Sequence, residues 1–338
     1  MNKNFSVKSR HVILVIFLLA IVICASLGAS TKQSSPPDNS EVSTEKTITS
    51  SEPEEPVREE TTEKLVQVYV DPKLYDSAVV TENDFVALYK QADENSAVQE
   101  KLHRGEWTAY LGEEKNWIHV QTNKGKTGYI SKENTKIKEI TRYKEPKQLQ
   151  QLTVVLDAGH GGMDSGAVSN DETVMEKELT LKTALAAGEV LEKAGINVIY
   201  TRTEDTYLEL SEITEFSLEK NSDLFLSFHY DNYDYANVMK GFTTYYYYDK
   251  MKKFAETVTQ ELAKESTLNN NGVREGNYYV IRETYIPSLL LELGYMNSDE
   301  DLQVITTEEY RQKVAQAVLA SVKKFADEDY LIWNVEKE

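Results

Sequence analysis

The pattern of hydrophobic and polar residues changes several times along the chain. Within residues 64–142, apolar and polar residues alternate in short stretches such as residues 117–120 and 127–130. Turn-forming pairs, including Arg104-Gly105 and Lys124-Gly125, separate these stretches. Period-two alternation broken by turns is typical of half-buried strands. The pattern therefore predicts a small all-β module over residues 64–142.

From residue 151 onward the pattern is that of a domain with both strands and helices. Residues 153–156 and 224–228 are predominantly apolar runs, as buried strands are. Between them, apolar residues recur near the helical period and stop at Gly195, which predicts a helix with a glycine after its last turn. A further strand is expected at residues 196–201. This alternation predicts an α/β domain over residues 151–327, with an open, mostly parallel sheet and helices on both faces.

The first residues of the chain have the composition of an export segment. Lys3, Lys8 and Arg10 precede an uncharged apolar run at residues 12–27. This order predicts, for residues 1–29, either a cleaved signal peptide or a retained N-terminal membrane anchor. Because the basic residues come first, we expect everything after the run to lie outside the cell.

Three other segments connect or extend these parts. Residues 30–63 are rich in Pro, Ser, Thr and Glu and have few large apolar side chains, which predicts a disordered acidic linker. We expect a second, short linker at residues 143–150 and a C-terminal tail at residues 328–338.

Composition narrows the classes of partner and cofactor. The chain has 37 Lys and Arg residues against 56 Asp and Glu residues, a formal net charge of −19. This balance argues against nucleic acid as a partner, because binding to a phosphate backbone needs basic surface. The one cysteine, Cys24, excludes an intramolecular disulfide and a thiolate metal cluster. A bound metal must therefore use nitrogen and oxygen ligands.

Two of the five histidines lie in the predicted α/β domain, and each follows a predicted strand. They are His160 and His229. Because the carboxyl ends of parallel strands meet at one edge of a sheet, we expect both imidazoles at that edge. Two imidazoles and a carboxylate are the ligands of an open, hydrolytic zinc site. A structural role for a histidine at a strand end is the competing interpretation.

A glycine-rich turn surrounds the first of these histidines, with the sequence Asp157-Ala158-Gly159-His160-Gly161-Gly162. Its glycines leave room around the imidazole and permit a tight turn after the strand. A phosphate-binding loop would also be rich in glycine. However, neither a Lys-Ser/Thr pair nor the G-x-G-x-x-G spacing is present, so the turn favours a metal site over a nucleotide site.

Four separated motifs resemble those of a known enzyme family. They are the Gly-His-Gly-Gly turn followed by Asp-Ser-Gly-Ala at residues 164–167, Glu176-Lys177, Ser227-Phe228-His229, and residues 287–297. Taken together and in this order, they resemble the zinc-dependent N-acetylmuramoyl-L-alanine amidases of the amidase-3 type. The resemblance covers about residues 153–324, roughly half of the chain.

The resemblance implies a set of site residues. Carried over position by position, the zinc ligands are His160, Glu176 and His229, and the catalytic residue is Glu292. Spacing alone does not choose Glu176 over Glu172 or Glu178, whereas the family's Glu-Lys pair does. Glu292 is surrounded by leucines in a predicted buried strand, where an acid without a partner or a function is costly.

The resemblance also implies an activity. Members of this family use Zn²⁺ to activate water, which cleaves the amide bond between N-acetylmuramic acid and L-alanine. The expected substrate is therefore peptidoglycan, and the expected location is extracellular and associated with the cell wall. We expect a monomer. Two alternatives stay open: a zinc peptidase that acts on the stem peptide, and a non-catalytic protein that binds the cell wall.

Part of the β module resembles a second known family. Residues 85–137 resemble the bacterial SH3-like cell-wall modules in the Leu-His-Arg-Gly sequence at residues 102–105, in Trp117 and in the Gly-Tyr-Ile-Ser sequence at residues 128–131. This likeness implies a small SH3-like barrel that binds the cell wall. Trp107 and Trp117 are interpreted either as barrel core or as part of a ligand groove.

One feature of the catalytic half departs from the family pattern, and a second suggests contacts with sugars. The family has Ala-Asn after the second histidine, and this chain has Tyr230-Asp231. A run of tyrosines at residues 245–248 lies on a predicted strand, where alternate side chains face opposite ways. Two of the four are therefore candidates for stacking on sugar rings.

Overall fold

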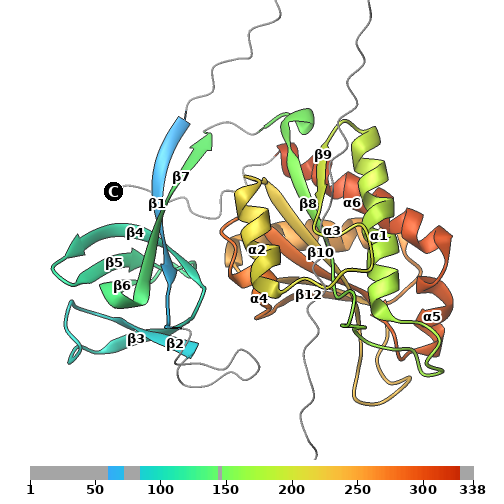
Figure 1. Ribbon diagram of the computed structural model, residues 1–338, viewed down its shortest axis with the longest axis horizontal. Coiled ribbons are helices and arrows are strands. Elements are labelled where there is room, and N and C mark those ends of the chain that lie inside the picture. Colours follow the sequence, from blue (N-terminus) through green and yellow to red (C-terminus); the bar gives the residue numbers. More distant parts are fainter. Residues whose placement is uncertain (1–59, 72–83, 144–146, 328–338) are drawn as a thin grey trace, which may run out of the picture. The chain divides into compact units, whose positions relative to one another are not determined.

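The computed structural model describes residues 60–71, 84–143 and 147–327 (Figure 1). The expected export segment at residues 1–29 and the expected tail at residues 328–338 lie outside these ranges, as does most of the expected linker at residues 30–63. Within the described ranges, no helix is long and apolar enough to cross a membrane.

The first module is all-β, as the sequence predicts. Its strands are β1 (Glu60–Val68), β2 (Phe85–Tyr89), β3 (Val98–His103), β4 (Trp107–Glu114), β5 (Trp117–Gln121), β6 (Thr127–Ser131) and β7 (Thr135–Tyr143), and a short 3-10 helix, η3 (Lys132–Asn134), precedes β7. They pair antiparallel in the order β3-β2-β6-β5-β4-β1-β7. Strand β1 includes residues 60–63, which the composition assigns to the linker.

The second module is an α/β domain. Its strands are β8 (Thr153–Ala158), β9 (Asn197–Tyr200), β10 (Leu224–Asp231), β11 (Phe242–Tyr246), β12 (Asn270–Glu275) and β13 (Ser288–Tyr295). Its helices are α1 (Glu176–Lys193), α2 (Leu210–Glu219), α3 (Lys252–Glu265), α4 (Tyr279–Arg282), α5 (Asp299–Ile305) and α6 (Glu308–Asp327), with short 3-10 helices η4 (Leu149–Gln151) and η5 (Asp249–Met251).

The sheet of this domain is mixed but mostly parallel. Its described strands lie in the order β12-β11-β13-β10-β8-β9, and only the β11–β13 pair is antiparallel. Helix α6 packs against both α1 and α3 on one face, while α2 and α4 lie on the other (Figure 1). The predicted fold class, with helices on both faces of a mostly parallel sheet, is confirmed.

The central strands are the most deeply buried part of the domain. Every residue of β13 is buried, and so are the residues of β10 up to Phe228. Their apolar side chains therefore serve both faces of the sheet, which explains why the sequence shows continuous apolar runs instead of alternation. Side chains at the carboxyl ends of these strands are therefore attached to backbone that is buried and packed on both faces.

The indole of Trp107 lies where the two modules, which belong to one compact unit, meet. Its side chain is buried within the hydrophobic cluster of the α/β domain, not within the core of the β module. The indole N–H donates a hydrogen bond of 2.9 Å to the carbonyl of Glu283, and the ring packs edge-on against Tyr285. Trp107 is thus neither barrel core nor part of a ligand groove. It is a contact between the modules.

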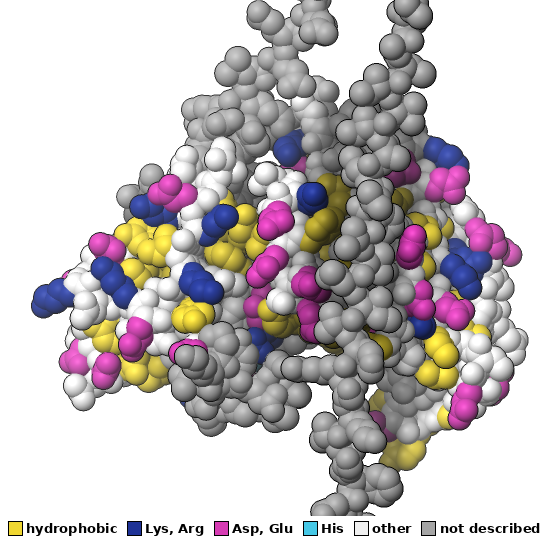
Figure 2. All heavy atoms as spheres, viewed as in Figure 1, with side chains coloured by type: hydrophobic (Ala, Val, Ile, Leu, Met, Phe, Trp, Pro, Cys, Tyr) yellow, Lys and Arg dark blue, Asp and Glu magenta, His cyan; other side chains and the backbone are white. Residues whose placement is uncertain are grey.

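Charged side chains of both signs are interspersed over the face seen in Figure 2. Several form exposed pairs on the β module, such as Lys64–Glu139 at 3.4 Å and Lys132–Glu113 at 3.3 Å. Pairs of this kind contribute little stability because water screens them. These pairs lie within the β module, so the contact between the two modules depends on other groups, among them buried ones.

Glu106 is a buried acid at this contact. Its carboxylate accepts hydrogen bonds from the Tyr247 hydroxyl at 3.0 Å and from the backbone N–H of His103 at 3.2 Å. The Asn123 amide donates a third hydrogen bond, at 3.3 Å. Burial raises the pKa of Glu106 to about 7, although the hydrogen bonds from Tyr247 and His103 act in the opposite direction.

This raised pKa predicts a pH-dependent stability. The folded chain keeps a proton on Glu106 that the unfolded chain releases near pH 4.5, so this group's contribution to the free energy of unfolding falls as the pH rises from 4.5 to about 7. The decrease is at most about 3 kcal/mol. In Glu106→Gln this contribution is absent, so the variant gains stability relative to the wild type between pH 5 and 7.5. Urea unfolding at several pH values measures the difference, and parallel profiles would contradict the prediction.

Candidate metal centre

His160 lies in the turn that follows β8, and its backbone has an unusual conformation. Its φ is +63°, in the left-handed region that non-glycine residues rarely adopt. The preceding Gly159 has a packing reason to be glycine, because a Cβ there would lie 2.2 Å from Cε1 of His229. The turn therefore brings the backbone before His160 directly against the second imidazole.

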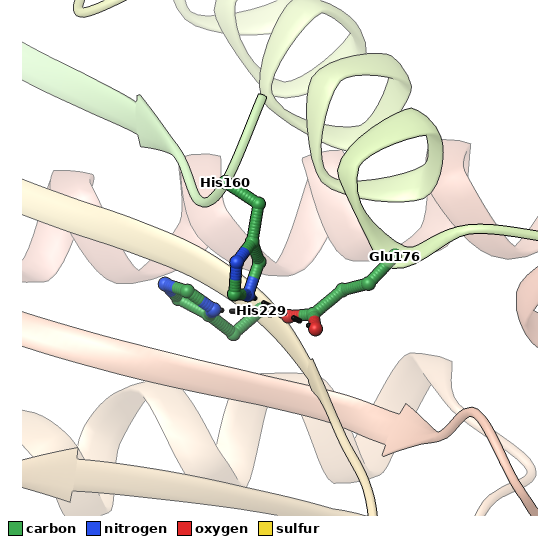
Figure 3. A group of neighbouring side chains, drawn as sticks. All are labelled: His160, Glu176 and His229. Atoms are coloured by element: carbon green, nitrogen blue, oxygen red, sulfur yellow. Dashed lines mark hydrogen bonds and ion pairs between the residues drawn. The ribbon is translucent and has the colours of Figure 1, made fainter. Parts of the chain in front are cut away.

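Three side chains converge at this point (Figure 3). Glu176 is the first residue of α1, and His229 lies near the end of β10. Glu176 Oε2 is 3.0 Å from His160 Nε2, and Glu176 Oε1 is 2.9 Å from His229 Nδ1. The two imidazole rings are 4.9 Å apart between centroids and nearly perpendicular.

The group has the composition and size of a metal site. Each of the three residues offers one ligand atom, and these atoms lie within 4.8 Å of one another. Two imidazole nitrogens and one carboxylate oxygen are the donor set of open, hydrolytic zinc sites. The group could therefore hold a divalent cation, as the two strand-end histidines suggest.

The electrostatics of the group favour positive charge. Burial by itself raises the pKa of Glu176, but hydrogen bonds from the two histidines and their charges hold that pKa well below its usual value. Burial lowers the pKa of His160, whereas the hydrogen bonds and charges of Glu176 and Asp164 raise it to about 9. The negative potential that retains a proton on His160 would equally attract a metal cation.

Asp164 contacts the imidazole of His160 at Nδ1, the ring nitrogen that does not face Glu176. Its Oδ2 lies 2.8 Å from His160 Nδ1, and its Oδ1 accepts a hydrogen bond of 3.0 Å from the backbone N–H of Gly166. A carboxylate on the second ring nitrogen fixes the orientation and tautomer of a metal-binding histidine. In the sequence, Asp164 belongs to the Asp-Ser-Gly-Ala motif at residues 164–167, but the sequence does not show that it contacts His160.

Gly166 provides space beside the carboxylate of Glu176. A Cβ at Gly166 would lie 2.5 Å from Glu176 Oε2 and 2.6 Å from His160 Cδ2. The neighbouring N–H of Ala167 donates a hydrogen bond of 2.8 Å to the same oxygen of Glu176. The loop before α1 is therefore shaped around the acid and holds it between the two rings.

Glu292 lies on β13, directly beside His229 in the register of the two parallel strands. Its side chain is buried, and Oε2 has no hydrogen-bond partner among the described residues. Burial, together with the charges of Glu176 and Asp231, raises the pKa of Glu292 well above its usual range. A buried acid without a partner is costly, so it indicates a group kept for a function or for a ligand.

Arg202 holds the turn and the helix together. This buried side chain donates hydrogen bonds to the carbonyls of Ala158 at 2.8 Å, of Gly159 at 2.9 Å and of Lys177 at 2.9 Å. It thus connects the backbone before His160 to the first turn of α1, where Glu176 lies. The sequence around Arg202 does not indicate this role, because nothing in its local pattern shows that its partners are backbone carbonyls.

The structure places the four predicted site residues close together, whereas the two other glutamates considered as ligands lie on the surface. Glu172 and Glu178, which spacing cannot separate from Glu176, are both exposed.

Of the tyrosine run at residues 245–248, Tyr245 alone is partly exposed, and the other three are buried. The expectation of two stacking faces is therefore wrong, because the strand ends at Tyr246 and the alternation stops there.

Comparison with known proteins identifies two families in the chain. Residues 154–324 match the N-acetylmuramoyl-L-alanine amidase family, and residues 84–136 match the bacterial SH3 domain family. Among curated proteins, the chain is 37% identical over 226 residues to the probable cell wall amidase LytH of Staphylococcus aureus. That match covers 66% of this chain and 76% of LytH.

Solved structures of amidases share the fold of the α/β domain. The catalytic domain of CwlV from Bacillus (Paenibacillus) polymyxa superposes with a TM-score of 0.51 and 32% identity, covering 52% of this chain and 99% of that one. An N-acetylmuramoyl-L-alanine amidase from Clostridium difficile 630 superposes with a TM-score of 0.51 and 29% identity, covering 53% and 98%. The chain belongs to the N-acetylmuramoyl-L-alanine amidase family, with a bacterial SH3 domain ahead of its catalytic domain.

Proposed function

We propose that the chain hydrolyses the amide bond between N-acetylmuramic acid and L-alanine of peptidoglycan, with Zn²⁺ held by His160, Glu176 and His229. The observation that carries this proposal is the convergence of the two imidazoles and Glu176 beside Glu292, a buried acid with an unpartnered oxygen. When bound, zinc lowers the pKa of a coordinated water to about 7 and polarises a carbonyl oxygen.

Glu292 is the proposed catalytic residue. Its place beside His229 puts a carboxyl group next to the proposed ligands. There it would take the proton of the attacking water and return it to the amine of the departing L-alanine. The raised pKa of Glu292 suits this role, because a general base that later acts as an acid works best with a pKa near the working pH.

The wider role follows from the two modules. We propose that the protein acts outside the cell on peptidoglycan and that its SH3 domain contributes binding to the cell wall. This location fits the described relative, a probable cell wall amidase. Export through residues 1–29 and a monomeric state remain part of the proposal.

Replacing the proposed general base tests the chemistry. We expect Glu292→Gln to bind zinc as the wild type does and to lose activity by at least about 100-fold, because the proton transfers have no acceptor. Zinc content by mass spectrometry and release of soluble product from purified peptidoglycan measure the two properties. Glu172→Gln is the matched control, since Glu172 is exposed, and it should keep full activity. Wild-type activity in Glu292→Gln would refute the role.

Analysis of the products separates the proposed activity from its rivals. An amidase leaves stem peptides that begin with a free L-alanine and glycan strands with free lactyl carboxylates. A peptidase would instead cut within the stem peptide, and a non-catalytic protein would release nothing.

Metal removal gives an independent test of the three ligands. We expect a chelator to abolish activity, added zinc to restore it, and zinc to raise the Tm of the metal-free protein. A ligand that binds only the folded state stabilises it by about 3 kcal/mol at 100 times its Kd. His229→Asn should lose this zinc-dependent shift, whereas His119→Asn, a histidine of the β module, should keep it. Equal shifts in both variants would argue against the site.

A further inference from the structure

The sheet continues past Glu292 toward its edge through β11 and β12. Thr243 of β11 pairs with Glu292, and Tyr245 pairs with both Leu290 and Arg274. Paired residues on neighbouring strands point to the same face, and so do residues two apart on one strand. Tyr245 and Arg274 therefore lie on the face of the sheet that carries Glu292.

Aromatic side chains line this part of the site. The ring of Tyr278 packs edge-on against Tyr245, with centroids 5.0 Å apart. Gly276 makes this packing possible, because a Cβ there would lie 2.6 Å from the Tyr278 ring and 2.7 Å from the Tyr245 ring. We call Arg274, Tyr245 and Tyr278 the β12 wall of the site.

Arg274 is the only lysine or arginine in the six described strands of this sheet. Its side chain is exposed and forms no hydrogen bond or ion pair with any described residue. The nearby buried or half-buried acids are Glu176, Glu292 and Asp231. Burial raises the pKa of Asp231, a hydrogen bond with Tyr295 lowers it, and the charge of Arg274 makes a smaller contribution in that same downward direction.

An exposed arginine without a partner among the described residues, on the face of the sheet that carries Glu292, can bind an anionic group of a substrate. The stem peptide is such a substrate. A carboxyl group of such a peptide is anionic when it is free and neutral when it is amidated. An arginine fork matches a carboxylate in two parallel hydrogen bonds, and it matches an amide poorly.

We propose that Arg274 is a specificity-determining residue that binds a free carboxylate of the stem peptide. The inference rests on the proposed amidase function. It adds that the enzyme distinguishes a free carboxylate of the stem peptide from its amide, and that the β12 wall is where this distinction is made.

Two synthetic muramyl peptides that differ only in this group, free carboxylate against amide, test the proposal. We expect the wild type to prefer the carboxylate by about tenfold in kcat/KM, mainly through KM, which is the effect of one charge-assisted contact. Arg274→Gln should lose this preference, so that the ratio falls to about one. Arg274→Lys keeps the charge without the fork and should show an intermediate ratio. Lys182→Gln, an exposed cation on α1, is the matched control and should keep the wild-type ratio.

A binding experiment adds a readout that does not depend on turnover. In the Glu292→Gln background, calorimetry should show tighter binding of the carboxylate peptide than of the amide peptide, and adding Arg274→Gln should remove the difference. A wild type that cleaves both peptides equally overturns the role of Arg274 and leaves the amidase function standing. So does an equal loss on both peptides in Arg274→Gln. A wild type that cleaves neither peptide refutes the proposed function itself.

Discussion

The carboxylate of Glu176, held between two imidazole rings, is the interaction on which the rest of the site depends. Each of its oxygens lies about 3 Å from one histidine nitrogen, and one of these histidines follows β8 whereas the other lies on β10. Without this acid, the rings of His160 and His229 would have no common partner. The negative charge of one buried group therefore sets both the position and the preferred ligand of the centre.

Part of this arrangement works against stability. Glu292 is buried and its Oε2 has no hydrogen-bond partner among the described residues, and a buried acid of this kind is costly. His160 also occupies a backbone region that few non-glycine residues adopt. Such strain persists where the surrounding structure imposes it. Here Arg202 binds the carbonyls of Ala158 and Gly159, directly before His160, and so supports that conformation.

The β module is more than an appended domain. Trp107 and Glu106 are buried against the α/β domain, and the Trp107 backbone N–H is hydrogen-bonded to the Tyr248 hydroxyl at 3.0 Å. Tyr247 and Tyr248 follow directly after β11, the strand that also carries Tyr245 of the β12 wall. Contacts of the β module are therefore continuous in sequence with one side of the candidate site. A sugar-stacking interpretation of all these tyrosines would have missed that two of them are engaged by the other module.

The sequence by itself determined the fold class and the order of the modules, because hydrophobic periodicity reports local burial. The apolar runs at residues 153–156 and 224–228, followed by His160 and His229, also placed two imidazoles at one sheet edge, since parallel strands end together. Periodicity could not choose among Glu172, Glu176 and Glu178. Only the family likeness pointed to one of them, and the fold buries that one alone.

The tertiary structure alone decided the contacts between residues far apart in sequence. Asp164 behind His160, the carbonyl partners of Arg202, and the placement of Arg274 beside Tyr245 depend on how turns and strands pack together. The position of Trp107 depends on the meeting of two modules. A sequence pattern repeats over a few residues and shows which side of a helix or strand is buried. It does not show which side chain, distant in the sequence, packs against that buried side.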